Sequence, residues 1–318
     1  MIKNNVILLF LILISSLSFA QDKNYTETEL NILTNSATIN GTLLIPNSKN
    51  KKALIILIPG SGPTDRNGNN SVMKNNSLKF LAEELTKENI ATYRYDKSVL
   101  SFTKDDKEKI DSLSFETFIE EAKSVIDYFK NSNNYAKIIV AGHSQGSLVG
   151  MVASKNKADA FISLEGAGRP LDEILVEQIE LQAPYLKEET LKIVTELKKG
   201  NTVEKFNPML TSLFNKQVQP FLISWLQYHP QKEIEKLTIP TLIINGSKDI
   251  QVKNIDAELL HKAAKNSELH LIDNMNHLFK EIKGDINENM LSYSNPELPV
   301  MKKLIDTILI FIKKQKSK

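Results

Sequence analysis

Residues 137–146 of the chain read Lys-Ile-Ile-Val-Ala-Gly-His-Ser-Gln-Gly, an apolar run followed by a Gly-X-Ser-X-Gly pentad centred on Ser144. The run predicts a buried strand, and residues 147–155 after the pentad are compatible with a helix. A pentad at such a strand-to-helix junction is typical of a nucleophile elbow. The turn should hold its serine in a strained conformation, and side chains at Gly142 and Gly146 would collide with the neighbouring strand or helix.

The pentad alone is a weak signal, so the pattern along the rest of the chain carries the fold prediction. Buried parallel strands are predicted over residues 53–58, 91–95, 138–141, 160–164, 241–245 and 269–272. Helices are predicted between them, over residues 78–87, 115–130, 148–155, 255–265 and 301–312. This alternation predicts an α/β fold with a mostly parallel, doubly wound sheet and helices on both of its faces.

Two segments do not follow this alternation of strands and helices. Residues 29–45 alternate apolar and polar side chains around Asn40 and Gly41, which predicts an antiparallel hairpin with its turn there. Residues 169–236 have helical patterns without a convincing strand, which predicts a helical cap inserted into one domain over residues 21–318. We expect the cap's aromatic side chains to pack against the main domain rather than to form a substrate wall; they are Tyr185, Phe206, Phe214, Phe221, Trp225 and Tyr228.

The first twenty residues have the pattern of a secretory signal peptide. Lys3 precedes an unbroken apolar stretch over residues 6–14, and Ser18 and Ala20 supply small side chains before a cleavage site at Gln21. We therefore expect an exported protein, periplasmic or secreted, with no stable membrane insertion after cleavage. An uncleaved anchor is the alternative, although so short an apolar run barely spans a bilayer.

Composition narrows the possible partners and chemistry. The chain has 318 residues, of which 41% are hydrophobic and 25% are charged, which suits one large α/β domain or two small ones. It has no cysteine, and this excludes a lipid-attached cysteine, disulfides, a thiol nucleophile and thiolate metal sites. A net charge of +2 gives no global field that would attract nucleic acid or an anionic membrane. The oligomeric state stays open.

A serine hydroxyl becomes a nucleophile only with a base in hydrogen-bond reach and a third group that orients this base. Both should follow strands, because α/β sheets place their sites at the carboxyl ends of strands. Asp249 follows the strand over residues 241–245, and His277 follows the strand over residues 269–272. We therefore predict Ser144 as nucleophile, His277 as base and Asp249 as the acid that fixes the tautomer of His277.

Rivals exist for the acid and for the base. Glu165 ends the strand over residues 160–164, a position that some hydrolases use for the acid, but Asp249 is favoured. The remaining histidines are expected to be structural or exposed, and they are His143, His229, His261 and His270.

Backbone amides should stabilise the negative charge that develops on an attacked carbonyl, because fixed donors need no reorganisation. Gln145, at the start of the helix after the pentad, should supply one amide. Ser61 should supply the other, because Gly60 and Gly62 flank it in the turn after the strand over residues 53–58. An ordinary glycine-rich turn is the alternative.

Six stretches match the motifs of one superfamily in the expected order: residues 58–69, 94–97, 142–146, 164–170, 246–252 and 276–279. With them the chain resembles the α/β-hydrolase superfamily, and more narrowly the EstD-like bacterial carboxylesterases and the serine aminopeptidase-like hydrolases. The resemblance implies the α/β-hydrolase fold and the same three catalytic residues. Two departures stand out. Pro59 replaces the first histidine of the HGGG turn of many lipases, and Ser98 follows Lys97 where many relatives have Arg-Gly.

The sequence therefore predicts an exported serine carboxylic ester hydrolase that acts on a small-molecule ester through an acyl-enzyme and needs no cofactor. A serine peptidase or amidase and a thioesterase are alternatives on the same fold. A non-catalytic binding module is the alternative from another class, and the intact set of three catalytic residues argues against it. Asp65 and Arg66 either pair to brace the turn around Ser61 or contact the substrate, and we expect bracing.

Overall fold

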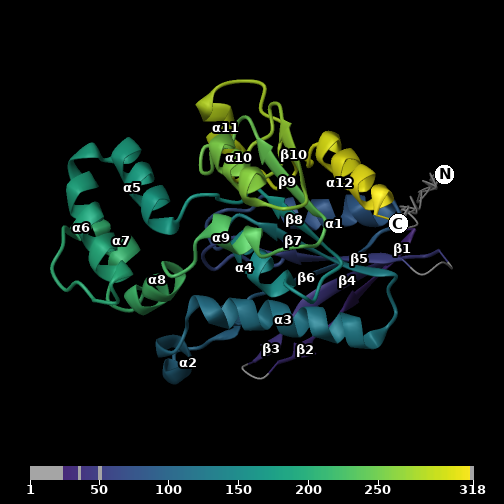
Figure 1. The fold of residues 1–318 in the computed structure, drawn as a ribbon, viewed down its shortest axis with the longest axis horizontal. Helices are drawn as coiled ribbons and strands as arrows, with labels where there is room; N and C mark the ends of the chain where they lie inside the picture. The colour runs from purple at the N-terminus through teal and green to yellow at the C-terminus, as the bar shows by residue number, and fades with distance from the viewer. Residues whose placement is uncertain (1–23, 35–36, 49–51, 316–318) are drawn as a thin grey trace, which may run out of the picture.

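The computed structural model describes residues 24–34, 37–48 and 52–315. The predicted signal peptide, residues 1–20, lies outside these residues. In the described part of the chain, no helix is both long and apolar enough to cross a bilayer. Figure 1 shows a central sheet, helices packed on both of its faces, and a group of further helices to one side.

An eight-stranded sheet forms the centre, in the order β1-β4-β6-β5-β7-β8-β9-β10. Its strands are β1 (Tyr25–Glu29), β4 (Gly41–Pro46), β5 (Ala53–Ile58), β6 (Ala91–Tyr95), β7 (Lys137–His143), β8 (Ala160–Leu164), β9 (Thr241–Gly246) and β10 (Ser267–Ile272). β4 pairs antiparallel with both β1 and β6, and every later pair is parallel. The predicted class, α/β with a mostly parallel sheet, is confirmed.

Helices cover both faces of the sheet because its central strands are apolar on both sides. In β5, successive side chains point to opposite faces, so Ile55 joins one buried cluster and Ile56 joins the other. The Ile56 face is covered by α3 (Phe115–Ser132), α4 (Gln145–Ser154) and α10 (Asn254–Ala263). The Ile55 face is covered by α1 (Ser77–Lys87) and α12 (Lys302–Lys314). Short elements that the sequence did not signal are a 3-10 turn at Ser98–Ser101, α2 (Lys107–Asp111) and α11 (Ile286–Ser292).

The N-terminal hairpin forms, but the prediction of its turn was wrong. Short strands β2 (Ile32–Leu33) and β3 (Thr38–Ile39) extend the hairpin beyond β1 and β4, and it closes where the Thr34 amide donates to Ala37 O at 2.9 Å. Asn40 instead lies between β3 and β4, and Gly41 is the first residue of β4. Gly41 is needed for packing, because a Cβ there would lie 2.1 Å from the Tyr93 hydroxyl oxygen.

Between β8 and β9 the chain forms only helices, and we call residues 169–236 the helical insertion. Its elements are α5 (Leu171–Gln182), α6 (Lys187–Lys198), α7 (Thr211–Phe214), α8 (Gln219–Trp225), α9 (Pro230–Glu235), and 3-10 turns at Pro184–Leu186 and Pro208–Leu210. The helical insertion has its own buried hydrophobic cluster, which includes Leu197 and Phe214. At its start, Arg169 forms an ion pair with the buried carboxylate of Asp256 on α10, at 2.8 Å. Figure 1 shows α5 to α8 standing beside the sheet and its covering helices.

The Gly-X-Ser-X-Gly pentad joins β7 to α4 in a tight, strained turn. Ser144 has φ 53° and ψ −120°, in the left-handed half of conformational space that a residue with a side chain rarely adopts. A Cβ at Gly142 would lie 2.1 Å from Gly146 O, and one at Gly146 would lie 2.5 Å from Ile58 O. The predicted strain and the predicted need for two glycines are both confirmed.

We expect Gly146→Ala to destabilise the fold by about 3 kcal/mol, because the added methyl group would meet backbone oxygens of Ile58 and Pro59, at 2.5 and 2.6 Å, which cannot swing away like a flexible side chain. Urea unfolding of both proteins measures the loss. Gly200→Ala is the control, because Gly200 has φ +87° but nothing within 4 Å of an added Cβ. The free energy of unfolding of this variant should fall by only about 1 kcal/mol, from backbone strain alone. Equal losses in the two variants would show that the collision at the pentad is not the cause.

Candidate active site

The structure brings His277 and Asp249 into direct contact. The loops that carry them follow β10 and β9, and the His277 Nδ1 lies 2.7 Å from the Asp249 Oδ2. Both side chains are buried. The second oxygen of Asp249 accepts hydrogen bonds from the amides of Gln251 and Val252, at 2.7 and 3.0 Å. A carboxylate held in this way keeps the proton of a neutral imidazole on Nδ1 and leaves Nε2 free to accept another proton.

Ser144 lies at the carboxyl end of β7, two strands away from β9 in the sheet. Its amide donates to Leu164 O at 2.9 Å, while its hydroxyl group forms no hydrogen bond with any described residue. The rings of His143, the residue before Ser144, and of His277 have centroids 4.8 Å apart. The end of β7 and the loop that carries His277 therefore meet at this point. Catalytic hydrogen bonds often tighten only when a substrate binds, and an unbonded hydroxyl here is compatible with a nucleophile.

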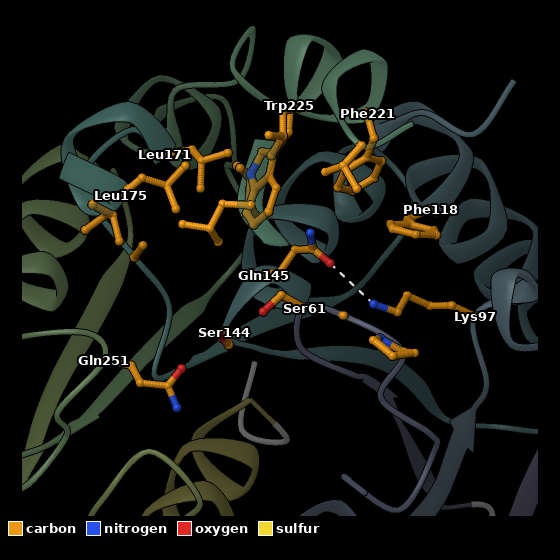
Figure 2. A pocket seen from close by; sticks show the side chains of 18 of the residues that line it. Ser61, Lys97, Phe118, Ser144, Gln145, Leu171, Leu175, Phe221, Trp225 and Gln251 are labelled. Atoms are coloured by element: carbon orange, nitrogen blue, oxygen red, sulfur yellow. Dashed lines mark hydrogen bonds between the residues drawn. The ribbon is translucent and has the colours of Figure 1, made fainter. Parts of the chain in front are cut away.

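The two residues predicted to supply amides for the negative charge, Ser61 and Gln145, line the same cavity as Ser144. Gln145 is the first residue of α4, where an amide has no partner within its own helix. Neither the Gln145 amide nor the Ser61 amide donates a hydrogen bond to another part of the described chain. The turn around Ser61 packs directly on the nucleophile, because a Cβ at Gly60 would lie 3.3 Å from the Ser144 Cβ. Figure 2 shows Ser61, Ser144 and Gln145 side by side at the base of the cavity.

Glu165, the alternative candidate for the acid, lies beside Asp249, and in the described chain it forms no hydrogen bond with His277. Single ligand atoms of Glu165, Asp249 and His277 all lie within 4.8 Å of one another, and Glu165 Oε2 accepts from the Gly246 amide at 3.0 Å. Burial, together with the negative charge of Asp249, raises the pKa of Glu165 well above its usual range. Burial would also raise the pKa of Asp249, but the charge of His277 and hydrogen bonds from His277 and Glu165 lower it overall. Glu165 is therefore the protonated member of the pair and Asp249 the ionised one.

Glu165, Asp249 and His277 together also form a donor set of the kind that binds divalent cations. In this arrangement, however, His277 and Asp249 already satisfy each other, and of the buried side-chain oxygens of the three residues only Glu165 Oε1 lacks a hydrogen-bond partner in the described chain. One oxygen of Asp249 accepts from His277 and the other from two backbone amides, while Glu165 carries a proton. A cation would have to displace these bonds, so the three residues are better suited to holding and moving a proton than to holding a metal.

His143 has a structural contact that the sequence analysis missed. Its Nε2 lies 2.9 Å from His277 O, and its ring packs edge-on against Phe279. Burial and then the charge of His277 lower the pKa of His143 to about 3, so its ring is neutral and Nε2–H can donate to that carbonyl. His143 therefore supports the loop that carries the base. No sequence pattern indicates this contact, because the fold alone brings the two residues together.

A buried amide network connects the loop of the base to the loop of the acid. Asn276 donates through Nδ2 to Asn289 Oδ1 at 2.9 Å, and Asn289 donates through its own Nδ2 to Lys248 O at 2.6 Å. Asn289 lies on α11, which thereby ties together the chain on either side of the hydrogen bond between His277 and Asp249. The sequence analysis identified Asn276 as part of a motif but not this role.

The other histidines lie elsewhere. His261 bonds to Ser267 through Nδ1 at 2.7 Å, His270 is partly exposed on β10, and His229 lies in the helical insertion before α9. In the described chain, the residues lining the cavity at Ser144 include none of these three.

A cavity of about 640 Å³ opens over Ser144, between the sheet domain and the helical insertion. Its wall is mostly apolar, and Figure 2 shows Leu171, Leu175, Phe221 and Trp225 of the insertion facing the base formed by Ser144 and Gln145. Phe118, Val99 and Leu148 of the sheet domain complete the wall; Figure 2 labels Phe118 among them.

The expectation that cap aromatics only pack was wrong for Phe221 and Trp225. The Trp225 ring stacks on Phe115, with ring centroids 5.4 Å apart, and it also lines the cavity. One face of a planar ring can pack while another part of it bounds a cavity.

The expectation that cap aromatics pack against the main domain holds for Tyr228, which packs on Phe115 of α3. It was wrong for Phe206 and Phe214, which pack on each other within the insertion, and for Tyr185, which is exposed.

Asp65 and Arg66 do not pair with each other, and neither lines the cavity. Asp65 accepts from the amides of Asn67 and Asn69, at 2.8 and 2.9 Å, and so shapes its own loop. Arg66 forms an ion pair with Asp96 at 2.8 Å. Bracing of the loop was the right expectation, but it works through these partners.

Solved structures of α/β hydrolases have the same fold. Est1E from Butyrivibrio proteoclasticus matches with a TM-score of 0.58 at 19% identity, covering 91% of this chain and 99% of that chain. The α/β hydrolase GrgF from a Penicillium species matches with a TM-score of 0.58 at 14% identity, covering 92% and 100%. An esterase from Pyrococcus furiosus matches with a TM-score of 0.55 at 16% identity, covering 92% of each chain. The chain therefore has the α/β-hydrolase fold.

By sequence, the chain is similar to Esterase EstD from Thermotoga maritima, with 26% identity over 285 residues. The similarity covers 84% of this chain and 64% of EstD, so the chain spans 64% of the length of the relative that it matches. No protein-family model matches the chain. The predicted resemblance to EstD-like esterases is confirmed.

We expect Glu165→Gln to become more stable relative to the parent protein as pH rises. In the unfolded chain Glu165 releases its proton near pH 4.3, whereas the folded protein retains it, so folding binds a proton above that pH and the parent loses stability. The difference in unfolding free energy should grow by up to about 1.4 kcal/mol per pH unit up to the raised pKa of the folded state. Urea unfolding of both proteins from pH 5 to 8 measures this slope. A difference that stays constant with pH would show that Glu165 is ionised in the fold.

Proposed function

We propose that the protein is a serine carboxylic ester hydrolase that works through Ser144, His277 and Asp249. The observation that carries this proposal is the buried hydrogen bond of 2.7 Å between His277 and Asp249, set beside a serine at a strained elbow. The free amides of Ser61 and Gln145 in the same cavity support it. So does the similarity to Esterase EstD.

The proposed reaction has two halves. Ser144 Oγ forms a bond to the ester carbonyl carbon while His277 Nε2 takes its proton, and Asp249 stabilises the resulting imidazolium. The amides of Ser61 and Gln145 donate to the carbonyl oxygen as it becomes negative. The bond to the alcohol then breaks, and His277 returns the proton to that oxygen. A water molecule, deprotonated by His277, then attacks the acyl carbon. The bond to Ser144 Oγ breaks, His277 returns the proton to this oxygen, and the acid leaves.

The cavity indicates the kind of ester. Its volume of about 640 Å³ and its apolar walls fit a small molecule with a sizeable apolar or aromatic group next to the ester bond. One structure with the same fold contains ferulic acid, an aromatic acid, bound to Est1E, and it matches with a TM-score of 0.59 at 20% identity. We propose an apolar acyl group as the part that the cavity selects.

Export is also part of the proposal. It rests on the signal-peptide pattern of residues 3–20, which lie outside the described residues. Release of these residues would leave a mature chain that begins at Gln21 and contains every residue of the proposed site.

We expect the mature chain, residues 21–318, to hydrolyse p-nitrophenyl esters, with the highest kcat/KM at intermediate acyl length because the cavity is large but its wall, which includes Phe221 and Trp225, limits the group that fits. Ser144→Ala should lower kcat by at least about 10⁴-fold, because the nucleophile is lost. Aminoacyl anilides and acyl thioesters are assayed in parallel. Preference for anilides would establish the peptidase alternative, preference for thioesters the thioesterase, and no Ser144-dependent turnover of any of the three would contradict catalysis on these substrates.

We expect Asp249→Asn and Glu165→Gln to behave oppositely, although each replaces a buried carboxyl by its amide. Asp249→Asn removes the charge that orients His277 and should lower kcat by about 10⁴-fold. Glu165→Gln replaces a protonated acid by a group of similar shape and hydrogen-bonding capacity, so kcat should stay within about threefold of the parent. Steady-state kinetics on one ester decides. The reverse order of losses would make Glu165 the acid.

A further inference from the structure

Lys97 is a buried cation at the cavity that the proposed reaction does not use. It is 3% exposed, and its Nζ donates to Gly60 O at 2.7 Å and to Gln145 Oε1 at 3.4 Å. The ammonium also lies 4.8 Å from the centre of the Phe118 ring. Among the described residues no carboxylate forms an ion pair with it. Figure 2 shows Lys97 reaching across the base of the cavity to Gln145.

The first of these bonds fixes the direction of the Ser61 amide. Gly60 O and the Ser61 N–H belong to one peptide unit, and in a trans peptide they point in opposite directions. A carbonyl held on Lys97 therefore aims the Ser61 N–H away from Lys97. A cation on the carbonyl oxygen also polarises the peptide, which makes its N–H a stronger donor.

The second bond reaches the other donor. Lys97 contacts the side chain of Gln145, whose backbone amide is the donor at the start of α4. Lys97 thus contacts the carbonyl of the Ser61 peptide unit and the side chain of Gln145, and it lines the same cavity as Ser144.

We propose that Lys97 is a positioning residue that sets the two amide donors of Ser61 and Gln145 for the developing oxyanion. The inference deepens the proposed ester hydrolysis and rests on it.

The rest of the Arg-Tyr-Asp-Lys segment supports this role. Arg94 donates through Nε to Asn67 Oδ1 at 3.0 Å, and Asp96 accepts from both the backbone amide and the guanidinium of Arg66, at 2.7 and 3.0 Å. Both partners lie in the loop that continues from the turn around Ser61. The end of β6 therefore holds this loop at three points, and Lys97 is the one next to the donor.

Keeping Lys97 charged costs free energy, because its ammonium group is buried away from water. Burial lowers its pKa to about 8, against the attraction of Glu121 on α3, which is the charged group that faces it. Glu121 itself bonds to Ser98, and burial raises the pKa of that carboxyl. At neutral pH Lys97 is therefore charged, and it loses its proton as pH rises through about 8. An apolar side chain would avoid the desolvation penalty, so the cation is better explained by its contacts than by stability.

The kinetic test compares Lys97→Met with Lys123→Met, an exchange of a more exposed lysine on α3. We expect Lys97→Met to lower kcat by about 10²-fold with KM within about twofold, since oxyanion donors act in the transition state. The parent and Lys123→Met should lose activity above about pH 8, where Lys97 becomes neutral, and Lys97→Met should lack this decline. An unchanged kcat overturns the inference, as does a raised KM with kcat unchanged, which would make Lys97 a substrate contact.

A second measurement does not depend on turnover. The amide ¹H–¹⁵N signal of Ser61 in the intact parent protein should shift with a midpoint near pH 8, because Lys97 donates to Gly60 O, the carbonyl of the peptide unit that contains this amide. The shift should persist in Lys123→Met and disappear in Lys97→Met. A parent that hydrolyses none of the substrates but shows the shift would contradict the proposed function while leaving the Lys97 contact established. A Ser61 signal that does not move between pH 6 and 10 overturns the inference even if the enzyme is active.

Discussion

The close approach of α4 to the end of β5 is the constraint on which the site depends. Gly146 lies so near Ile58 O that no side chain fits between them. This contact brings the first amide of α4 opposite the turn after β5, where the second donor lies. It also forces the turn at Ser144, whose strained φ of 53° is held by the packing of β7, α4 and β5 around it. The strain and the placement of both donors therefore have one steric origin.

Burial then decides which groups of the site are charged. Asp249 stays ionised because hydrogen bonds and His277 compensate for its burial, whereas Glu165 and His143 lack such compensation and stay neutral. Lys97 remains a cation at neutral pH beside a backbone carbonyl. Two groups therefore stay charged: Asp249, which contacts His277, and Lys97, which contacts the carbonyl of the peptide unit that carries the Ser61 amide. Asp249 faces the imidazole that becomes positive in the proposed reaction, whereas Lys97 acts on the proposed oxyanion through that peptide unit.

Local sequence patterns predicted the features that depend on residues close together in the chain, such as the bounds of strands. Strands β5, β6 and β8 have the predicted bounds, because each is a short, mostly apolar segment whose residues are all buried. The order of Ser144, Asp249 and His277 after their strands was equally readable. The hairpin turn was misplaced because Gly41 serves a tertiary contact with Tyr93, which looks the same in sequence as a turn glycine. The contacts of Glu165, His143 and Lys97 join residues far apart in the chain, and no periodicity encodes them.

The helical insertion and the sheet contribute differently to the cavity. The sheet and its flanking turns supply every group of the proposed chemistry, while α5 and α8 supply part of the apolar wall, including Leu171, Leu175, Phe221 and Trp225. The insertion is attached through Arg169 to Asp256 and through the stacking of Trp225 on Phe115. Because Trp225 both packs and bounds the cavity, the shape of the wall is coupled to the docking of the insertion. A change in side chains there would alter which acyl group fits without touching the hydrogen bonds around His277, so selectivity and catalysis can vary separately in this architecture.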